Sequence, residues 1–211
     1  MGLKERRQRE RDEVRGKIMD AARDLFAAEG IEAVSMRKIA DAVEYSPTII
    51  YQHVTDKEAL LHELCSQDFG ALAAAFTEIA SISDPILRIG QIAIAYARFG
   101  IENPNHYRLM FMTPFHQKEL DEDDMCKKGN PDQDGYAFLK KAVTEAIEAG
   151  RYRDGLDNPE LISQVLWAAV HGVVSLQITK AKDVWLDWQP FEKRIQLMLD
   201  ALQRGMARET K

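Results

Sequence analysis

Apolar residues recur at intervals of three and four along almost the whole of this 211-residue chain, and this spacing limits its possible folds more than any other feature. The spacing puts apolar side chains on one face of an α-helix, whereas a half-buried strand needs strict alternation, which is not sustained anywhere. Glycines, prolines and capping residues separate the periodic segments. The sequence therefore predicts an all-α protein of about nine helices.

Four helices are predicted in the first part of the chain. Their ranges are Val14–Phe26, Met36–Val43, Pro47–His53 and Asp56–Ile82. Ser35, Ser46 and Asp56 occupy N-cap positions, Pro47 stands at a first helical position, and Gly30 follows the first helix as a stop signal. We place a domain boundary inside the fourth helix. It separates residues 1–60, which hold three short helices, from a larger helical body over residues 61–211.

The body contains the remaining predicted helices. Their ranges are Pro85–Phe99, His106–Met112, Tyr136–Ala149, Pro159–Thr179 and Phe191–Ala207. The polar, acidic segment 118–134 contains Gly129-Asn130-Pro131 and is predicted to be a loop. No internal repeat or low-complexity tract is found.

Composition favours a protein of the reducing cytoplasm. The two cysteines, Cys65 and Cys126, match no metal-ligand or redox spacing, and Cys65 lies among apolar residues as a core filler. No stretch approaches the roughly 18 consecutive apolar residues of a membrane helix. The charged start lacks the apolar run of a secretory signal. No metal and no cofactor is expected.

Charge is unevenly distributed. The formal net charge is −6, yet the segment 4–17 carries seven basic residues and four acidic ones. A locally basic end on an acidic body is typical of a nucleic-acid contact. The segment is either an arm or helix extension that touches DNA, or a solvated tail, because glutamates and aspartates are interspersed in it.

Residues 35–54 form two short capped helices joined tightly at Glu44-Tyr45. Ile39 and Ala40 of the first helix would pack on Ile50 of the second and leave the other face of the second helix outward. This is helix-turn-helix geometry, in which the second helix fits the major groove of DNA. The alternative is an ordinary helical hairpin with a solvated polar face.

The side chains on the outward face suit a DNA groove. Thr48 and Gln52 can form hydrogen bonds with base edges, and Ile49 can contact a thymine methyl group. Tyr51 and His53 can donate to phosphate oxygens. The full set of candidate DNA-binding residues is Ser35, Arg37, Lys38, Pro47, Thr48, Ile49, Tyr51, Gln52, His53 and Lys57.

The segment 18–61 resembles the DNA-binding region of the TetR (tetracycline-repressor-like) family. The matching pieces are Ala21-Ala22-Arg23-Asp24-Leu25-Phe26, Gly30, Val34-Ser35-Met36-Arg37-Lys38-Ile39-Ala40, Ser46, Ile50-Tyr51-Gln52-His53-Val54 and Asp56-Lys57-Glu58-Ala59-Leu60-Leu61. The resemblance implies that Arg37, Pro47, Thr48, Ile49, Tyr51, His53 and Lys57 stand at positions that contact DNA. The family usually has glycine and then valine in the turn, where this chain has Glu44 and Tyr45. If the turn needs a positive φ, Glu44 is strained by roughly 1 kcal/mol.

The body resembles a TetR C-terminal domain of the Trp-His-Gly type. The matching pieces are Glu102-Asn103-Pro104-Asn105-His106-Tyr107-Arg108-Leu109-Met110-Phe111 and Trp167-Ala168-Ala169-Val170-His171-Gly172. The resemblance implies that the last two helices pair with their copies in a homodimer. The helix Pro159–Thr179 is apolar nearly all round, which agrees, although burial in the core would also explain it.

The resemblance also implies a small-molecule effector, and aromatic residues in the body suit a largely apolar pocket. The candidates are Phe76, Tyr96, Phe99, Tyr107, Met110, Phe111, Phe115, Trp167 and His171. For each of them ordinary core packing is the alternative, and for His171 a hydrogen-bonded structural histidine. The predicted function is a repressor that binds a palindromic operator as a homodimer and is released by the effector.

Two other classes of function are alternatives to a DNA-binding regulator. An enzyme is disfavoured because none of the five histidines stands in a recognised catalytic or phosphate-binding motif. The segment 130–135 resembles a calcium loop, but its twelfth position would be Lys141, where glutamate is needed. A helical interaction module without DNA binding is the other alternative, and salt-dependent binding to DNA would distinguish it.

Overall fold

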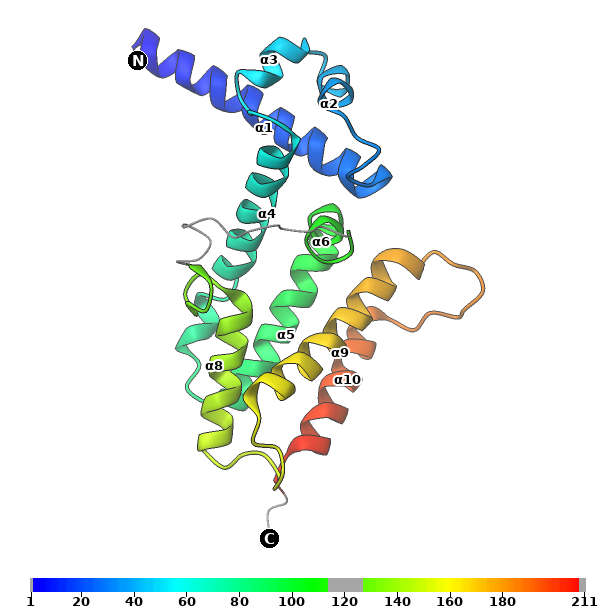
Figure 1. The fold of residues 1–211 in the computed structure, drawn as a ribbon. Coiled ribbons are helices and arrows are strands. Elements are labelled where there is room, and N and C mark those ends of the chain that lie inside the picture. Colours follow the sequence, from blue (N-terminus) through cyan, green and yellow to red (C-terminus); the bar gives the residue numbers. More distant parts are fainter. Residues whose placement is uncertain (1, 114–126, 209–211) are drawn as a thin grey trace. The chain divides into compact units, whose positions relative to one another are not determined.

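The structure is a computed structural model that describes residues 2–113 and 127–208. These residues form nine α-helices and one short 3-10 helix, with no strand among them (Figure 1). The helices are α1 (Leu3–Glu29), α2 (Met36–Ala42), α3 (Pro47–Tyr51), α4 (Lys57–Ala74), η1 (Glu78–Ser81), α5 (Pro85–Glu102), α6 (Pro104–Phe111), α8 (Gly135–Glu148), α9 (Pro159–Lys180) and α10 (Phe191–Met206). The predicted all-α class is confirmed.

The chain divides into two compact units. The first comprises the residues up to Asp68 and the segment that starts at Asn105, so it includes most of α6. The second comprises Phe69–Pro104 and the described residues from 127 onward. The division falls inside α4.

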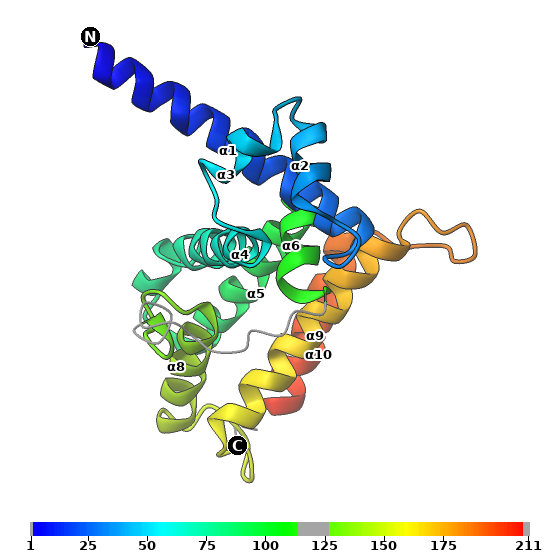
Figure 2. The same cartoon turned by 45° about the horizontal axis from the view of Figure 1, so that its top comes forward.

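The first unit is built around one apolar core to which α1, α2, α3, α4 and α6 all contribute. Figure 2 shows α2 and α3 beside α1. The fully buried members include Ile18 and Ala22 of α1, Ile39 and Ala40 of α2, Ile50 of α3, Leu60 and Leu64 of α4, and Leu109 of α6. The predicted packing of Ile39 and Ala40 with Ile50 is therefore confirmed, since all three have an exposed fraction of 0%.

The helix starts follow the predicted capping signals. The Ser35 hydroxyl accepts from the Lys38 backbone N–H at 3.2 Å, and the Asp56 carboxylate accepts from the Ala59 N–H at 2.8 Å. Ser46 stands at the N-cap position of α3 but makes no side-chain capping bond. α3 ends at Tyr51 and not at the predicted His53. The backbone N–H groups of Gln52 and His53 bond three residues back, which closes the helix with a tighter turn.

The fourth predicted helix was too long. α4 ends at Ala74, and η1 follows after a tight turn, whereas the sequence predicted one helix to Ile82. The N–H groups of Phe76 and Thr77 bond to carbonyls three residues back. The Phe76 ring is buried and stacks on Phe138 of α8 with 5.8 Å between ring centroids. The apolar spacing continues through this region, so spacing alone did not reveal where the α-helix stops.

Glu44 adopts the left-handed backbone conformation that its place in the turn had suggested. Its φ is 58°, and it is the one non-glycine residue with positive φ in the described part of the chain. A side chain with a Cβ is strained there, whereas glycine is not.

We expect Glu44→Gly to raise the free energy of unfolding by about 1 kcal/mol, because it relieves this strain. Urea denaturation measures the change. Glu44→Ala is the matched control, since it also removes the carboxylate but keeps the Cβ. Equal stability of the two variants would contradict the assignment of strain to the backbone.

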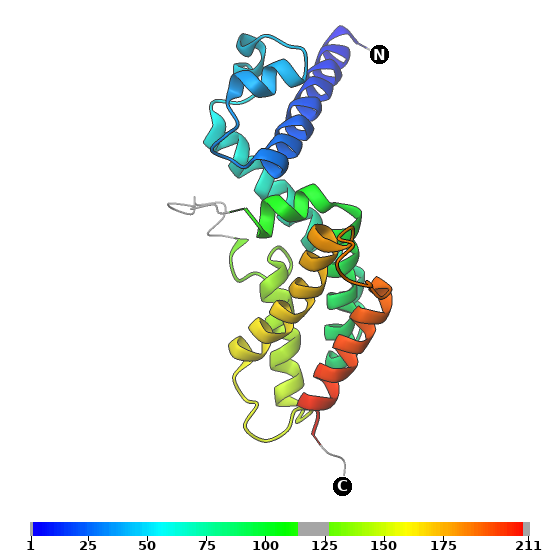
Figure 3. The same cartoon turned by 90° about the vertical axis from the view of Figure 1, so that its right-hand side faces the viewer.

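The second unit is a bundle of α5, α8, α9 and α10, which Figure 3 shows from the side. Asp84, Asp134 and Asn158 cap α5, α8 and α9 through side-chain oxygens that accept from backbone N–H groups. The predicted loop 118–134 is only partly observed, because residues 118–126 lie outside the described residues. Residues 128–134 are turns and irregular backbone.

By length and composition α9 could cross a membrane, although the sequence has no unbroken apolar run of that length. Uncharged polar residues such as Gln164, His171 and Ser175 interrupt the run without adding charge. Only 22% of its most apolar 18-residue window is buried.

Candidate nucleic-acid interface

α3 presents a polar face on the side opposite its buried residue. Ile50 is fixed in the core with no exposed surface, while Pro47, Thr48, Tyr51 and Gln52 are exposed. Tyr51 has 54% of its surface exposed although it is a large aromatic residue. The outward orientation predicted for these side chains is thus observed, while Ile49 and His53 are only half-exposed.

Three cationic side chains near α3 differ in exposure and in their hydrogen-bond or ion-pair partners. Arg37 at the start of α2 is exposed. The neighbouring Lys38 forms an ion pair with Glu29 of α1. Lys57 at the start of α4 is half-buried, and its Nζ donates to the Ile31 carbonyl at 3.1 Å. Because an ammonium has three N–H donors, this bond holds Lys57 against the domain and leaves two donors for a phosphate.

Arg15 has a structural role that the sequence did not reveal. Its guanidinium donates to the His53 carbonyl just after α3 and forms an ion pair with Glu63 of α4. A cation is favourable at the C-terminal end of a helix because the last carbonyls carry partial negative charge. Arg15 therefore ties α1, the end of α3 and α4 together. The available signal was its position one turn before Ile18, on the face of α1 that enters the core.

His53 is held as a neutral imidazole. Burial lowers its pKa, and the positive charges of Arg11 and Arg15 lower it further. Its Nδ1 is buried and has no hydrogen-bond partner among the described residues. A neutral imidazole can donate one N–H to a phosphate oxygen without carrying a charge.

The first unit also contains a buried ion network that sequence reasoning missed. Arg23 of α1 and Asp68 of α4 have exposed fractions of 6% and 2%. Two bonds join the guanidinium to the carboxylate, Nε to Oδ2 at 3.2 Å and Nη2 to Oδ1 at 3.0 Å. His106 Nδ1 of α6 lies 2.9 Å from the same carboxylate. The network therefore links three helices through one buried acid.

Cys65, next to this network, is a free thiol packed against the apolar core. Burial, together with the nearby carboxylate of Asp68, raises the pKa of the thiol to about 11. The thiol form is therefore stable and unreactive at neutral pH. This agrees with the predicted role of Cys65 as a core filler.

Three of the candidate effector residues meet in the second unit. Trp167 Nε1 of α9 donates to the Tyr96 hydroxyl of α5 at 3.1 Å, and the same hydroxyl lies 3.2 Å from His171 Nδ1. Burial lowers the pKa of His171, which keeps this imidazole neutral. The three side chains thus form a small polar group between apolar surfaces of α5 and α9.

The other candidates belong partly to the second unit and partly to the first. Phe76 stacks on Phe138, and Phe99 is buried on α5. Tyr107, Met110 and Phe111 belong to the first unit, where the rings of Tyr107 and Phe111 contact each other with 5.0 Å between centroids. Phe115 lies outside the described residues. No local sequence signal indicates that α6 packs with the first unit.

The described geometry defines a class of protein. An apolar core to which α1, α2, α3, α4 and α6 contribute presents the short helix α3 with an exposed polar face, and a helical bundle forms the second unit. This is the architecture of a helix-turn-helix DNA-binding regulator.

Comparison with known proteins gives the family. Residues 18–64 match the model of bacterial regulatory proteins of the tetR family, and residues 89–202 match the tetracyclin repressor-like C-terminal domain. The chain therefore belongs to the TetR family of transcriptional regulators. Members of this family regulate transcription and are not enzymes, so the expectation that this chain is no enzyme is confirmed.

Curated relatives match only part of the chain. The HTH-type transcriptional regulator UidR of Escherichia coli K12 is 35% identical over 71 residues, which is 34% of this chain and 36% of that protein. The chain thus matches only about a third of that relative's length.

Solved structures share the fold over nearly the whole chain. PfmR, a TetR family regulator of Thermus thermophilus, has a TM-score of 0.68 at 21% identity, and the match covers 91% of this chain and 96% of PfmR. The ketosteroid transcriptional regulator KstR2 of Mycobacterium tuberculosis has a TM-score of 0.66 at 20% identity, with 92% and 95% covered. At these identities the likeness concerns the fold alone.

Proposed function

We propose that this protein is a homodimeric repressor that binds a palindromic DNA operator through α3 and is released by a small-molecule effector. The observation that carries the proposal is the two-sided character of α3. Ile50 anchors the helix in the core, and the exposed Thr48, Tyr51 and Gln52 face away from it. The helix end is held by Arg15, so its outward side chains are presented by a fixed scaffold.

The contacts divide by chemistry into two kinds. Thr48, Ile49 and Gln52 suit base edges, which carry sequence information. The residues around them suit contacts with the DNA backbone, which set the position of the protein on the duplex. These residues are Ser35, Arg37, Lys38, Pro47, Tyr51, His53 and Lys57. DNA is in the cytoplasm of a bacterium, so we place the regulator there.

Dimerisation is supported by two apolar stripes that are exposed in the part of the chain that the structure describes. On α9 the exposed Leu161, Val165, Ala168 and Leu176 follow one another at helical spacing. On α10 the exposed Leu197, Ala201 and Gly205 do the same. A second copy of the chain that packs these stripes against its own would form a four-helix interface. The dimer could then read two half-sites about one helical turn apart.

The effector part of the proposal is supported by the group of Tyr96, Trp167 and His171. A few polar groups within an apolar helical bundle suit a largely apolar ligand with a hydrogen-bonding atom. A structural neighbour, KstR2, is named for regulation linked to ketosteroids, which are of this chemical kind. Such a ligand releases the operator only if it binds the DNA-free conformation better than the DNA-bound one.

Selection of bound duplexes from random DNA tests the DNA and dimer parts together, and a palindromic consensus is the expected result. We expect Gln52→Ala to relax the choice of base at one position in each half-site, by about 1–3 kcal/mol of discrimination. The backbone carbonyl of Gln52, which accepts from Arg11 at 3.4 Å, remains in this variant.

Tyr51→Ala is the matched control, because loss of a phosphate contact weakens all sequences alike. An unchanged consensus and affinity in both variants would contradict the role of α3. Failure to select any duplex would contradict DNA binding as a whole.

A further inference from the structure

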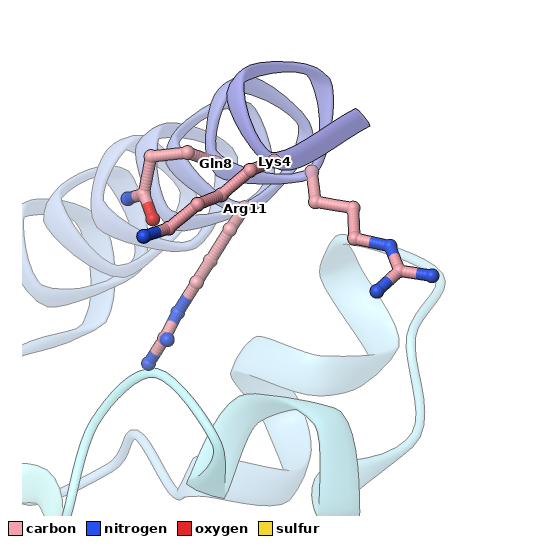
Figure 4. Close-up of a pocket in the computed structure, with 4 residues that line it drawn as sticks. Lys4, Gln8 and Arg11 are labelled. Atoms are coloured by element: carbon pink, nitrogen blue, oxygen red, sulfur yellow. The ribbon is translucent and has the colours of Figure 1, made fainter. Parts of the chain in front are cut away.

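α1 extends well beyond the core that it helps to build. Its first residue packed against the core is Val14, yet the helix begins at Leu3, so about ten residues continue the helix past the apolar contacts. Lys4, Arg7, Gln8 and Arg11 of this extension line a shallow surface pocket (Figure 4). Their spacing of three and four residues puts them on one face of the helix. We call this the cationic face of α1.

Glu10 and Glu13 lie on other sides of the helix and are paired with cations, while Glu5 accepts from the Gly2 backbone N–H. Arg6 forms an ion pair with Glu10, and Lys17 forms one with Glu13. Asp12 is the acid nearest the cationic face, where it accepts from the Gln8 amide at 2.8 Å. Within the described residues no carboxylate forms a salt bridge with Lys4, Arg7 or Arg11. The face thus presents three cations without neutralising partners.

The cationic face turns toward the end of the recognition helix. Arg11 Nη2 lies 3.4 Å from the Gln52 carbonyl, and Arg15, one turn further on, bonds the His53 carbonyl. Figure 4 shows the Arg11 side chain pointing from α1 to the loop after α3. Lys4 and Arg7 lie on the same face, about 10 Å and 6 Å along the axis beyond Arg11, since a helix rises 1.5 Å per residue. A duplex held by α3 would therefore pass beside them.

We propose that Lys4, Arg7 and Arg11 form a clamp on the DNA backbone that binds phosphates next to the half-site read by α3. Phosphates along one strand advance by about 3.4 Å of helix axis, so a cationic row about 10 Å long can meet two or three of them. The helix is already formed, so binding does not have to order a disordered arm. The clamp rests on the proposed DNA-binding function and adds affinity without adding base selectivity.

The test compares two double variants of the full chain that remove equal charge from the same helix. Lys4→Gln with Arg7→Gln alters the cationic face and leaves the Arg11 contact with Gln52 in place. Arg6→Gln with Arg9→Gln alters the other sides. The DNA is a duplex obtained by random selection, extended by about eight base pairs at each end. Fluorescence anisotropy measures binding of the protein to this duplex between 50 and 300 mM salt. Circular dichroism confirms that both variants keep the helical content of the parent chain.

We call Lys4→Gln with Arg7→Gln the clamp variant and Arg6→Gln with Arg9→Gln the control variant. For the clamp variant we expect the slope of the logarithm of the binding constant against the logarithm of the salt concentration to fall in magnitude by about 1 for each lost phosphate contact. Two lost contacts in each protomer give a change of about 4 for a dimer. The control variant should change it by less than half as much. Trimming the duplex to the half-sites should remove the difference between the parent chain and the clamp variant, and the selected sequence should stay the same. Equal slopes for the two variants would overturn the clamp while leaving the proposed function intact. Absence of binding by the parent chain would instead overturn the proposed function.

Discussion

Asp68→Ala is expected to destabilise the protein by about 3–5 kcal/mol, because it leaves the Arg23 guanidinium buried without its carboxylate. Arg23 is 6% exposed and forms two hydrogen bonds with Asp68. His106 of α6 loses the same partner. The cost comes from a buried charge that keeps only the exposed Asp20 as an acidic partner, and not from the loss of one average hydrogen bond. Urea unfolding at a fixed protein concentration measures it, since association with a second copy would otherwise change the apparent stability.

Asp20→Ala is the control for this prediction. Asp20 pairs with the same guanidinium at 3.0 Å, but its side chain is 78% exposed, so its loss should cost less than about 1 kcal/mol. Replacement of both Arg23 and Asp68 by leucine should cost less than Asp68→Ala alone, because no charge is then buried. Similar losses for Asp68→Ala and Asp20→Ala would show that the buried pair is not the source of the effect.

Leu176→Glu combined with Leu197→Glu is expected to convert the proposed dimer into a monomer and to abolish tight operator binding. The two leucines lie on the exposed stripes of α9 and α10, with 47% and 71% of their surfaces open in the monomer. Symmetry places four such side chains in the interface, and each contributes about 1.5 kcal/mol when buried. The dimer dissociation constant should therefore rise by about 10⁴-fold. Analytical ultracentrifugation measures this constant directly.

Val184→Glu is the matched control for the dimer prediction. Val184 is also a fully exposed apolar residue, but it lies in the connection between α9 and α10 and on neither stripe. Its replacement should leave both the dimer and DNA binding unchanged. A double variant that stays dimeric would place the interface elsewhere, and a parent chain that is itself monomeric would remove the proposal.

Local sequence signals predicted the first unit well because they act over a few residues. Ser35 and Asp56 cap their helices as expected, and Ile50 faces inward while Thr48 and Gln52 face outward. Strain was predicted at Glu44 if the turn needs a positive φ, and the φ of Glu44 is 58°. The signals were weaker where an α-helix gives way to a tighter turn, as after Ala74. There the apolar spacing continues, and the packing of Phe76 on Phe138 is a contact between residues far apart in the chain.

The sequence alone was enough to determine the all-helical class, the positions of most helices and the outward face of α3. The signals for these features are periodicity, capping residues and the turn at Glu44, and each signal depends on neighbours within about one helical turn. The tertiary structure decided that Arg15 holds the end of α3, that Asp68 is buried between Arg23 and His106, and that α6 belongs with the first unit. It also decided that Arg11, on the cationic face of α1, points to the loop after α3. These relations join residues far apart in the chain, 45 positions in the case of Arg23 and Asp68, and no local pattern encodes which charged side chain will find which partner.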